Sequence, residues 1–424
     1  MNINEFKNRF KNGLLDGALE KLYGEDACYQ QQRYINILNE FSRRFPSRTD
    51  VRIFSAPGRS EIGGNHTDHQ RGCALGAAIN LDAAAVVAFH DENIIRVYSE
   101  GYGLCEVALE DLTVHEDEKG RTAAIIRGVA SGFAGLGVKA EGFDAYVSSN
   151  VTGGSGLSSS AAFETLIGTI INIKYNDGKA AAAELAKLGQ FAENVYFGKA
   201  SGLLDQLVCC EGGFVFIDFE NTANPLVKRF DFDFERAGFC LCITDTHGSH
   251  SDLTDDYTAV PGEMKSVAAY FGRDVLRDVA EDDFYNEIPK LREICGDRAV
   301  MRAAHFFGEN RRAVLEAKAL ESGDLPKFFE LYRQSASSSE SLLQNLYSTK
   351  KPREQAIPVA LMISRLALGK NAAARVHGGG FAGTIQAIVP KEQTPDYVEA
   401  IDKVFGEGSC KILKIRPAGG VEIK

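Results

Sequence analysis

The sequence predicts an α+β protein of two lobes, in which each lobe combines mixed sheet with helices. The chain has 424 residues, of which 44% are hydrophobic, so it can bury a large core in more than one domain. Runs of β type occur in both halves, and segments with helical spacing of apolar residues lie between them. We place an N-terminal lobe over residues 25–212 and a C-terminal lobe over 213–424, against which a helix over 1–24 packs.

The N-terminal half alternates between helices and strands. Apolar residues at helical spacing predict helix within residues 1–45, and the pattern turns to strands from about Val51 to Val107. The elements expected here are strands over 83–90, 94–100 and 143–151, and helices over 123–136, 160–175 and 181–197.

The C-terminal half begins and ends with strands. Two or more helices with charged polar faces fill residues 298–369. The strands expected around them cover 212–218, 239–246, 383–389 and 410–415.

Composition excludes several classes of function. The net charge is −11, which argues against a broad surface for nucleic acid or an anionic membrane. No apolar run approaches the roughly 20 residues of a membrane helix, and the first residues lack the apolar segment of a signal peptide. The nine cysteines form no CxxC pair, which favours reduced thiols in a cytoplasm. A monomer is the default expectation.

The stretch "SAPGRSEIGGNHTDH" (55–69) places charged and polar side chains between glycines. It resembles a bendable loop, and three interpretations stay open. The stretch could be a metal site, a polar loop with no task, or a pocket that grips a polyhydroxylated ligand.

A second loop, "NVTGGSGLSSSAAFE" (150–164), joins a predicted strand to a predicted helix. Glycines let the backbone turn its N–H groups inward, and the helix N-terminus adds partial positive charge, so the loop suits a phosphate. Serine hydroxyls can reach a magnesium ion. The loop lacks the Walker pattern, and a flexible loop with a serine cap is the alternative.

Two further segments carry chemistry. In "RVHGGGFAGTIQAIV" (375–389), the cluster of small residues indicates either close backbone approach to a ligand or a wide turn. In "QFAENVYFGKASGLLDQLVCCEGG" (190–213), Glu193 lies within a helix and Asp205 lies among leucines. A carboxylate in apolar surroundings is costly unless it is paired or functional, although a helix cap is the simpler alternative.

Taken together, these motifs resemble the galactokinases. "PGRSEIGGNHTDH", "GGSGLSSSAAFE", "AEN…GLLDQ" and "HGGGFAG" occur in the order of that family, with Tyr257 seven residues after His250. The galactokinases belong to a superfamily of small-molecule kinases that includes homoserine, mevalonate and phosphomevalonate kinases. The resemblance runs from about residue 20 to 420.

The resemblance implies transfer of the ATP γ-phosphate to the anomeric hydroxyl of galactose, in a cleft between two lobes. It implies that Asp205 contacts the C1 hydroxyl and that Arg59 lies beside it, faces the phosphoryl group and keeps the carboxylate ionised. Ser159 or Ser160, with Glu193, would hold Mg²⁺. The sugar would be held by Asn65, His66, Asp68, Gly202 and Tyr257. The ATP phosphates would be wrapped by Gly153, Gly154, Ser155, Gly156, Leu157, Ser158, Ser159 and Ser160.

Two departures from the galactokinase pattern bear on the choice of sugar. Asn65 stands where the family has a glutamate near the C6 hydroxyl, and Glu61 stands where it has an asparagine. An amide repels a C6 carboxylate less than a glutamate does, so galacturonate is an alternative substrate. N-acetylgalactosamine and arabinose are others.

Two other classes of function are alternatives. A metal site could use His66, Asp68, His69, His247 and His250, although no Cys/His spacing matches a structural zinc site. A non-catalytic, sugar-responsive regulator is the second. Catalysis is favoured because "GLSSSAA" is intact and Arg59, Glu193 and Asp205 are all present.

Overall fold

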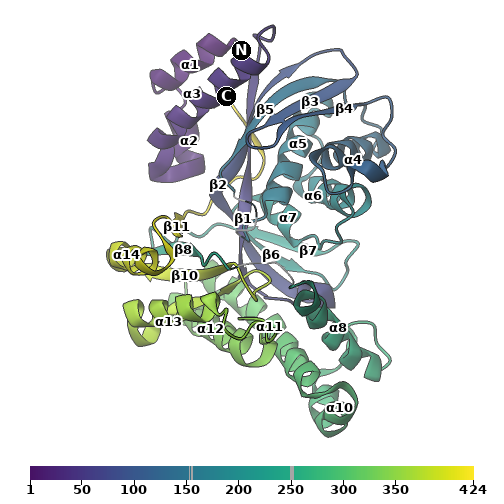
Figure 1. Cartoon of the computed structure of the whole chain (residues 1–424), viewed down its shortest axis with the longest axis vertical. Coiled ribbons are helices and arrows are strands. Elements are labelled where there is room, and N and C mark those ends of the chain that lie inside the picture. The colour runs from purple at the N-terminus through teal and green to yellow at the C-terminus, as the bar shows by residue number, and fades with distance from the viewer. Residues whose placement is uncertain (152, 154–155, 249–252) are drawn as a thin grey trace.

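Two sheets surrounded by helices form the molecule, which we describe from a computed structural model (Figure 1). The structure describes residues 1–151, 153, 156–248 and 253–424. The predicted α+β class is confirmed. In this described part, no helix has both the length and the apolar character to span a membrane.

The first sheet has eight strands and is mostly antiparallel. Its path runs β12-β1-β2-β5-β3-β4, and β6 pairs with β2 and with β7. Only β3 and β5 pair in parallel among the register pairs of this sheet. The strands are β1 (Arg52–Gly63), β2 (Cys73–Phe89), β3 (Ile94–Ser99), β4 (Gly103–Ala108), β5 (Phe143–Ser149), β6 (Phe214–Asp218), β7 (Leu226–Phe230) and β12 (Val421–Ile423).

The second sheet has four antiparallel strands in the order β11-β8-β10-β9. Apolar residues of these strands, such as Leu241 and Ile388, share one hydrophobic core with the first sheet. This shared core places the two sheets next to each other. The strands are β8 (Phe239–Asp245), β9 (Ala373–His377), β10 (Thr384–Pro390) and β11 (Cys410–Leu413).

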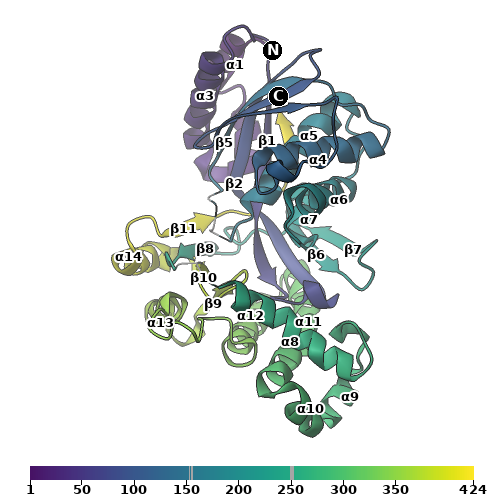
Figure 2. The ribbon, with the colours of Figure 1, turned by 45° about the vertical axis from the view of Figure 1, so that its right-hand side comes forward.

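Helices cover both faces of the first sheet (Figures 1 and 2). Successive side chains of a strand point to opposite faces. On β2, Val86 therefore packs under the N-terminal helices, whereas Val87 packs under the other helical layer. The N-terminal layer consists of α1 (Ile3–Lys11), α2 (Asp16–Tyr23) and α3 (Ala27–Arg44). The other layer consists of α4 (Thr122–Gly135), α5 (Ser159–Tyr175), α6 (Ala182–Phe191), a π-helical turn (Ala192–Phe197) and α7 (Leu204–Glu211).

The remaining helices surround the second sheet and the lower end of β1 and β2 (Figure 2). The longest, α11, packs against both β1 and β2 and against α12. These helices are α8 (Thr254–Tyr270), α9 (Glu281–Asn286), α10 (Ile288–Cys295), α11 (Asp297–Ser322), α12 (Leu325–Ser338), α13 (Ala356–Leu368) and α14 (Thr394–Phe405).

Most predicted elements agree with the structure to within a few residues, and the stretch 55–69 agrees only in part. The strand pattern expected from about Val51 holds for this stretch, because residues up to Gly63 belong to β1, whereas the bendable loop expected at its first part is wrong. The pairing with β2 shifts register between Pro57 and Arg59 and again between Glu61 and Gly63. These irregularities bend the strand and re-aim its side chains.

The pairing of strands does not follow the predicted boundary at residues 212 and 213. β6, β7 and β12 come after that boundary and belong to the first sheet. The N-terminal helices pack on the first sheet through residues such as Phe10 and Tyr34, and this packing includes Ile423 of β12, which lies after the predicted boundary. How the chain divides into domains stays a prediction.

Candidate active site

A bidentate ion pair lies at the centre of the candidate site. Arg59, on β1, donates from Nε to Asp205 Oδ1 and from Nη2 to Asp205 Oδ2, and both distances are 2.7 Å. Asp205 lies in the first turn of α7. Two parallel N–H···O bonds of this kind fix the orientation of both groups.

The glycine–serine loop closes around this pair. The carbonyl of Gly156 accepts a hydrogen bond from Arg59 Nη1, and the carbonyl of Leu157 accepts one from the Arg59 backbone at 3.1 Å. The Ser158 hydroxyl donates to Asp205 Oδ2. Of the predicted phosphate-binding residues, Gly154 and Ser155 lie outside the described residues.

The Asp205 carboxylate is held in its charged form. Burial alone would raise its pKa, but the Arg59 charge and the hydrogen bonds from Arg59 and Ser158 outweigh burial and hold the pKa below its ordinary value. The Asp205 side chain keeps 34% of its surface exposed, whereas that of Arg59 keeps 11%. The site therefore presents an ionised, reachable carboxylate beside a buried cation.

The predicted phosphate loop leads into the first turn of α5. Ser158 precedes the helix in the left-handed conformation, with φ at 60°. Ser159 and Ser160 then begin the helix, where backbone N–H groups lack intrahelical partners and attract anions. Gly156 lies close to the second sheet, since a Cβ there would lie 3.1 Å from His377 Nδ1.

Two oxygen ligands suited to magnesium lie beside this turn. Ser160 Oγ is 3.1 Å from Glu193 Oε1, and Lys199 Nζ is 2.7 Å from the same oxygen. Mg²⁺ prefers oxygen ligands and commonly uses one or two protein groups together with phosphate oxygens. The predicted pair Ser160 and Glu193 therefore fits a magnesium ion, and the lysine shows that Glu193 Oε1 already attracts a cation.

Glu164 and Gln206 connect these parts, and motif reasoning missed both. Gln206 Nε2 is 3.0 Å from Glu193 Oε2 and 3.0 Å from Glu164 Oε2. Burial, with the nearby Glu193 charge, raises the pKa of Glu164 to about 8. Gln206 follows Asp205 directly, so this bridge links α7 to the candidate magnesium ligand. The sequence feature that could have pointed to Glu164 is its position one helical turn after Ser160, which places both on the same face of the helix.

Asp68 and Gly202, two predicted sugar ligands, lie against each other. A Cβ built on Gly202 would lie 2.8 Å from Asp68 Oδ2, so only glycine lets the two segments approach this closely. Asp68 begins a short 3₁₀ turn after β1, and Gly202 lies three residues before Asp205.

Two other predicted sugar ligands contact the glycine-rich turn between β9 and β10. His66 Nε2 is 3.0 Å from the carbonyl of Gly379, and the Tyr257 hydroxyl donates to the carbonyl of Gly380 at 2.9 Å. Since a carbonyl only accepts, His66 Nε2 carries the proton in this contact. Burial lowers the pKa of His66, which favours the neutral ring.

Asn65 is buried among protein groups, and its expected contact with a sugar stays a prediction. Its side chain was expected to face the C6 substituent of a sugar, but the residue is only 1% exposed and its amide bonds to protein groups. Sequence reasoning could not find this arrangement, because the partners come from β1, the 378–380 turn and the segment around Asn345.

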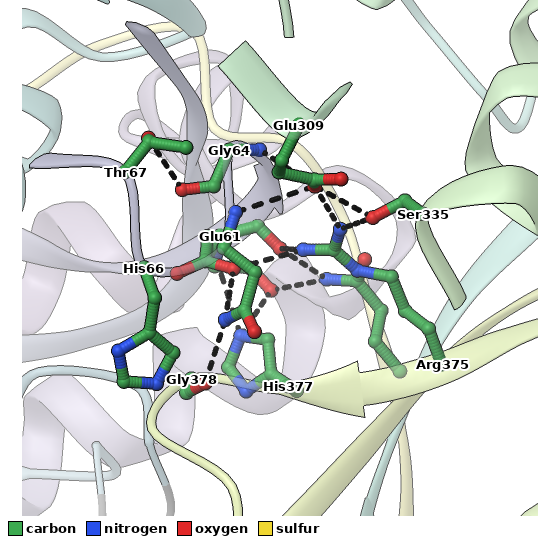
Figure 3. A network of polar contacts seen from close by, with 12 residues as sticks. Glu61, Gly64, His66, Thr67, Glu309, Ser335, Arg375, His377 and Gly378 are labelled. Carbon is green, nitrogen blue, oxygen red and sulfur yellow. Dashed lines mark hydrogen bonds and ion pairs between the residues drawn. The ribbon is translucent and has the colours of Figure 1, made fainter. Parts of the chain in front are cut away.

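Glu61 belongs to a buried polar network with Arg375, Ser335 and Glu309 (Figure 3). Arg375 Nη2 lies 2.9 Å from Glu61 Oε1, and Arg375 Nη1 donates to Ser335 Oγ at 2.8 Å. Burial raises the pKa of Glu61 to about 7 in spite of Arg375 and Asn65. Burial also opposes ionisation of Glu309, but Arg312, His305 and Arg375 lower its pKa to about 2.

The histidines of the alternative metal site have other contacts. The rings of His66 and His69 lie 5.7 Å apart, and His247 Nε2 lies 3.0 Å from Ser409 Oγ. His250 lies outside the described residues. Within the described ranges, no group of three or more His, Cys, Asp or Glu side chains is arranged to hold a metal ion.

Comparison with known proteins agrees with this geometry. A family model described as the galactokinase galactose-binding signature matches residues 39–89, which include Arg59. A second model, described as the N-terminal domain of GHMP kinases, matches residues 123–213, which include Glu193 and Asp205.

Curated relatives match over most of the chain. The galactokinase of Mannheimia succiniciproducens is 28% identical over 89% of this chain and 94% of its own length. The galactokinase of Glaesserella parasuis is 29% identical over 88% and 92%. The chain therefore resembles galactokinases over most of its length, and its two matching family models are those of galactokinases and GHMP kinases.

Solved structures confirm the GHMP kinase fold. The crystal structure of Lactococcus lactis galactokinase complexed with galactose aligns with a TM-score of 0.76 at 23% identity, covering 90% of this chain and 98% of that one. A crystal structure of mevalonate kinase aligns with a TM-score of 0.57 at 16% identity, covering 86% and 98%.

Proposed function

We propose that this chain transfers the γ-phosphate of ATP to the anomeric hydroxyl of galactose and produces galactose 1-phosphate. The observation that carries the proposal is the Arg59–Asp205 pair. Arg59 contacts the phosphate-type loop at Gly156, and Asp205 follows three residues after Gly202, which lies against Asp68. A phosphoryl donor and a polyhydroxylated acceptor would thus meet at one carboxylate.

Asp205 acts on the acceptor hydroxyl in this proposal. Its lowered pKa keeps it ionised at neutral pH, so it accepts a hydrogen bond from the C1 hydroxyl and orients the attacking oxygen. The same low pKa makes it a weak base. The proton therefore leaves late, as the new bond to phosphorus forms, which suits the loose transition state of phosphoryl transfer.

Positive charge around the phosphates comes from three directions. Arg59 provides a guanidinium beside the transferring group, and the first turn of α5 provides backbone N–H groups from Ser159 and Ser160. Ser160 and Glu193 would hold Mg²⁺, which neutralises the charge on the β- and γ-phosphate oxygens when it is bound. Gly153 to Ser160 wrap the phosphates in this proposal.

Asp68 and the backbone at Gly202 are the proposed sugar contacts, and His66 and Tyr257 border the same turn. The Asp68 carboxylate accepts no hydrogen bond from any other side chain in the described part of the chain. Its oxygens can therefore accept hydrogen bonds from sugar hydroxyls. The argument for galacturonate rested on Asn65 facing C6, and the buried amide removes that support. A cytoplasmic monomer without nucleic-acid or membrane partners stays a prediction.

A screen of ADP release tests the proposal. The purified chain is supplied with ATP, Mg²⁺ and one acceptor at a time: galactose, galacturonate, N-acetylgalactosamine, arabinose, glucose or mevalonate. We expect galactose to give the highest kcat/KM. Galactose binding without ADP release would indicate the regulator instead, and equal rates on unrelated alcohols would overturn the assignment.

A further inference from the structure

The Asn65 side chain has no N–H group left for a substrate. Its amide nitrogen donates to Glu61 Oε1 at 2.9 Å and to the Gly378 carbonyl at 2.8 Å. Its Oδ1 accepts from Asn345 Nδ2 at 3.1 Å. An amide carries only two N–H donors, so both are used within the protein.

The surroundings of Asn65 require an amide and disfavour a carboxylate. Glu61 lies four residues earlier on β1, and its Oε1 accepts from both Asn65 and Arg375. Glu309 Oε1 lies 3.3 Å from the Asn65 backbone nitrogen, and the Gly378 group is a carbonyl. A carboxylate at position 65 would set an acceptor against the Glu61 carboxyl and the Gly378 carbonyl, which now both accept from the Asn65 amide, and buried acceptors that face each other without a donor are costly. The carboxylate of this pair therefore belongs on residue 61.

The same amide anchors one end of the turn between β9 and β10. Asn65, His66 and Tyr257 contact the carbonyls of the consecutive residues 378, 379 and 380. This turn is therefore held by three side chains that the sequence associates with the sugar. Asn65 also connects to the buried Glu61–Arg375 pair, which Figure 3 shows.

We propose that Glu61 and Asn65 form a positioning pair that holds the 378–380 turn against residues 64–68, and that Asn65 does not contact the sugar. The first part stands on the contacts alone. The second part rests on the proposed function, because it concerns how galactose is recognised.

Hydrogen exchange of the unliganded protein tests the first part. Asn65→Ser removes the bonds to Glu61 and Gly378. We expect amides of the peptide over 376–384, which include the Phe381 N–H, to exchange about tenfold faster, the factor that one lost hydrogen bond typically carries. Asn172→Ser is the matched control, because Asn172 on α5 is also a buried amide whose side chain bonds to protein groups, here the backbone N–H and carbonyl of Ala180. Unchanged exchange over 376–384, or an equal rise in the control, would overturn the pair.

A rescue experiment covers the case in which Asn65→Ser does not fold. Asn65→Asp keeps the side-chain shape but sets two acceptors against each other. Glu61→Gln in the same chain restores a donor between the two positions. We expect the double variant to be more stable than Asn65→Asp alone and to protect 376–384 better. Additive losses would contradict a direct pair.

A comparison of two sugars tests the second part. Galactose and 6-deoxygalactose differ only in the C6 hydroxyl, so a residue that contacts this group affects galactose alone. We expect Asn65→Ser to lower kcat/KM for both sugars alike, so that their ratio stays within about twofold of the wild-type ratio. A ratio that collapses toward unity would show that Asn65 contacts C6. If the wild-type chain used neither sugar, the proposed function would fail, whereas hydrogen exchange would still decide the pair.

Discussion

Arg59 and Asp205 lie 146 residues apart in the chain and face each other through two hydrogen bonds of equal length. The first comes from a bent strand and the second from the first turn of a short helix. The pair combines a buried cation with a more exposed anion, which leaves the carboxylate available to a substrate hydroxyl.

Asp205→Asn should lower kcat by more than about 10²-fold and change the galactose KM much less, because the ionised oxygen acts mainly in the transition state. Steady-state kinetics measures both constants. The matched control is Asp218→Asn, since Asp218 also pairs with an arginine, Arg277, at 2.9 Å. Near-normal turnover in a folded Asp205→Asn variant would remove Asp205 from the mechanism.

Glu193→Gln should raise the Mg²⁺ concentration that gives half-maximal velocity by about tenfold or more, because a neutral amide is a poor ligand for a hard cation. The galactose KM should stay near its original value. Glu340→Gln serves as the control, since Glu340 pairs with Arg365 on the surface. An unchanged Mg²⁺ requirement would show that the ion binds elsewhere.

Glu164→Gln should change how stability depends on pH. The folded protein holds the Glu164 proton up to a pKa of about 8, whereas the ordinary value is 4.5. Folding therefore favours the protonated form, and this contribution to stability is lost as the pH rises from about 4.5 to about 8.

The introduced glutamine cannot ionise, so the Glu164→Gln variant does not lose stability in this way as the pH rises. Its free energy of unfolding relative to the wild type should therefore increase between pH 5 and pH 8, by at least about 1 kcal/mol. Urea denaturation at several pH values measures the difference. Parallel curves for the two proteins would mean that Glu164 is already ionised at pH 5.

Gly202→Ala should raise the galactose KM about tenfold, because the new methyl group meets Asp68 Oδ2 at 2.8 Å and displaces a charged hydrogen-bonding group. The KM for ATP should not change. Gly135→Ala at the end of α4 is the control, since a Cβ there meets nothing within 4 Å. Equal effects on both substrates would point to a general disturbance of the fold.

The short motifs and the family resemblance led to two of the contacts at the candidate site. The expected contacts of Arg59 with Asp205 and of Ser159 or Ser160 with Glu193 came from the resemblance to galactokinases, and the structure brings Arg59 to Asp205 and Ser160 to Glu193. The helices α4 and α5 followed from apolar periodicity.

The features that the sequence did not predict depend on partners distant in sequence. Residues 55–63 resemble a loop in sequence because they carry polar side chains and glycines. In the structure they pair with β2 as a strand, and their polar side chains are buried against other polar groups. The position of Asn65 depends on Glu309 and Asn345, which lie in none of the singled-out segments. The one available hint was that an asparagine and a glutamate have exchanged places between positions 61 and 65.

The most direct test of the central claim is phosphorus NMR of the product formed from ATP and galactose. We predict one new phosphorus signal that couples to the anomeric proton, in an amount equal to the ADP released and absent with Asp205→Asn. A phosphate attached at C6, or ADP formed with free phosphate and no sugar phosphate, would contradict the account.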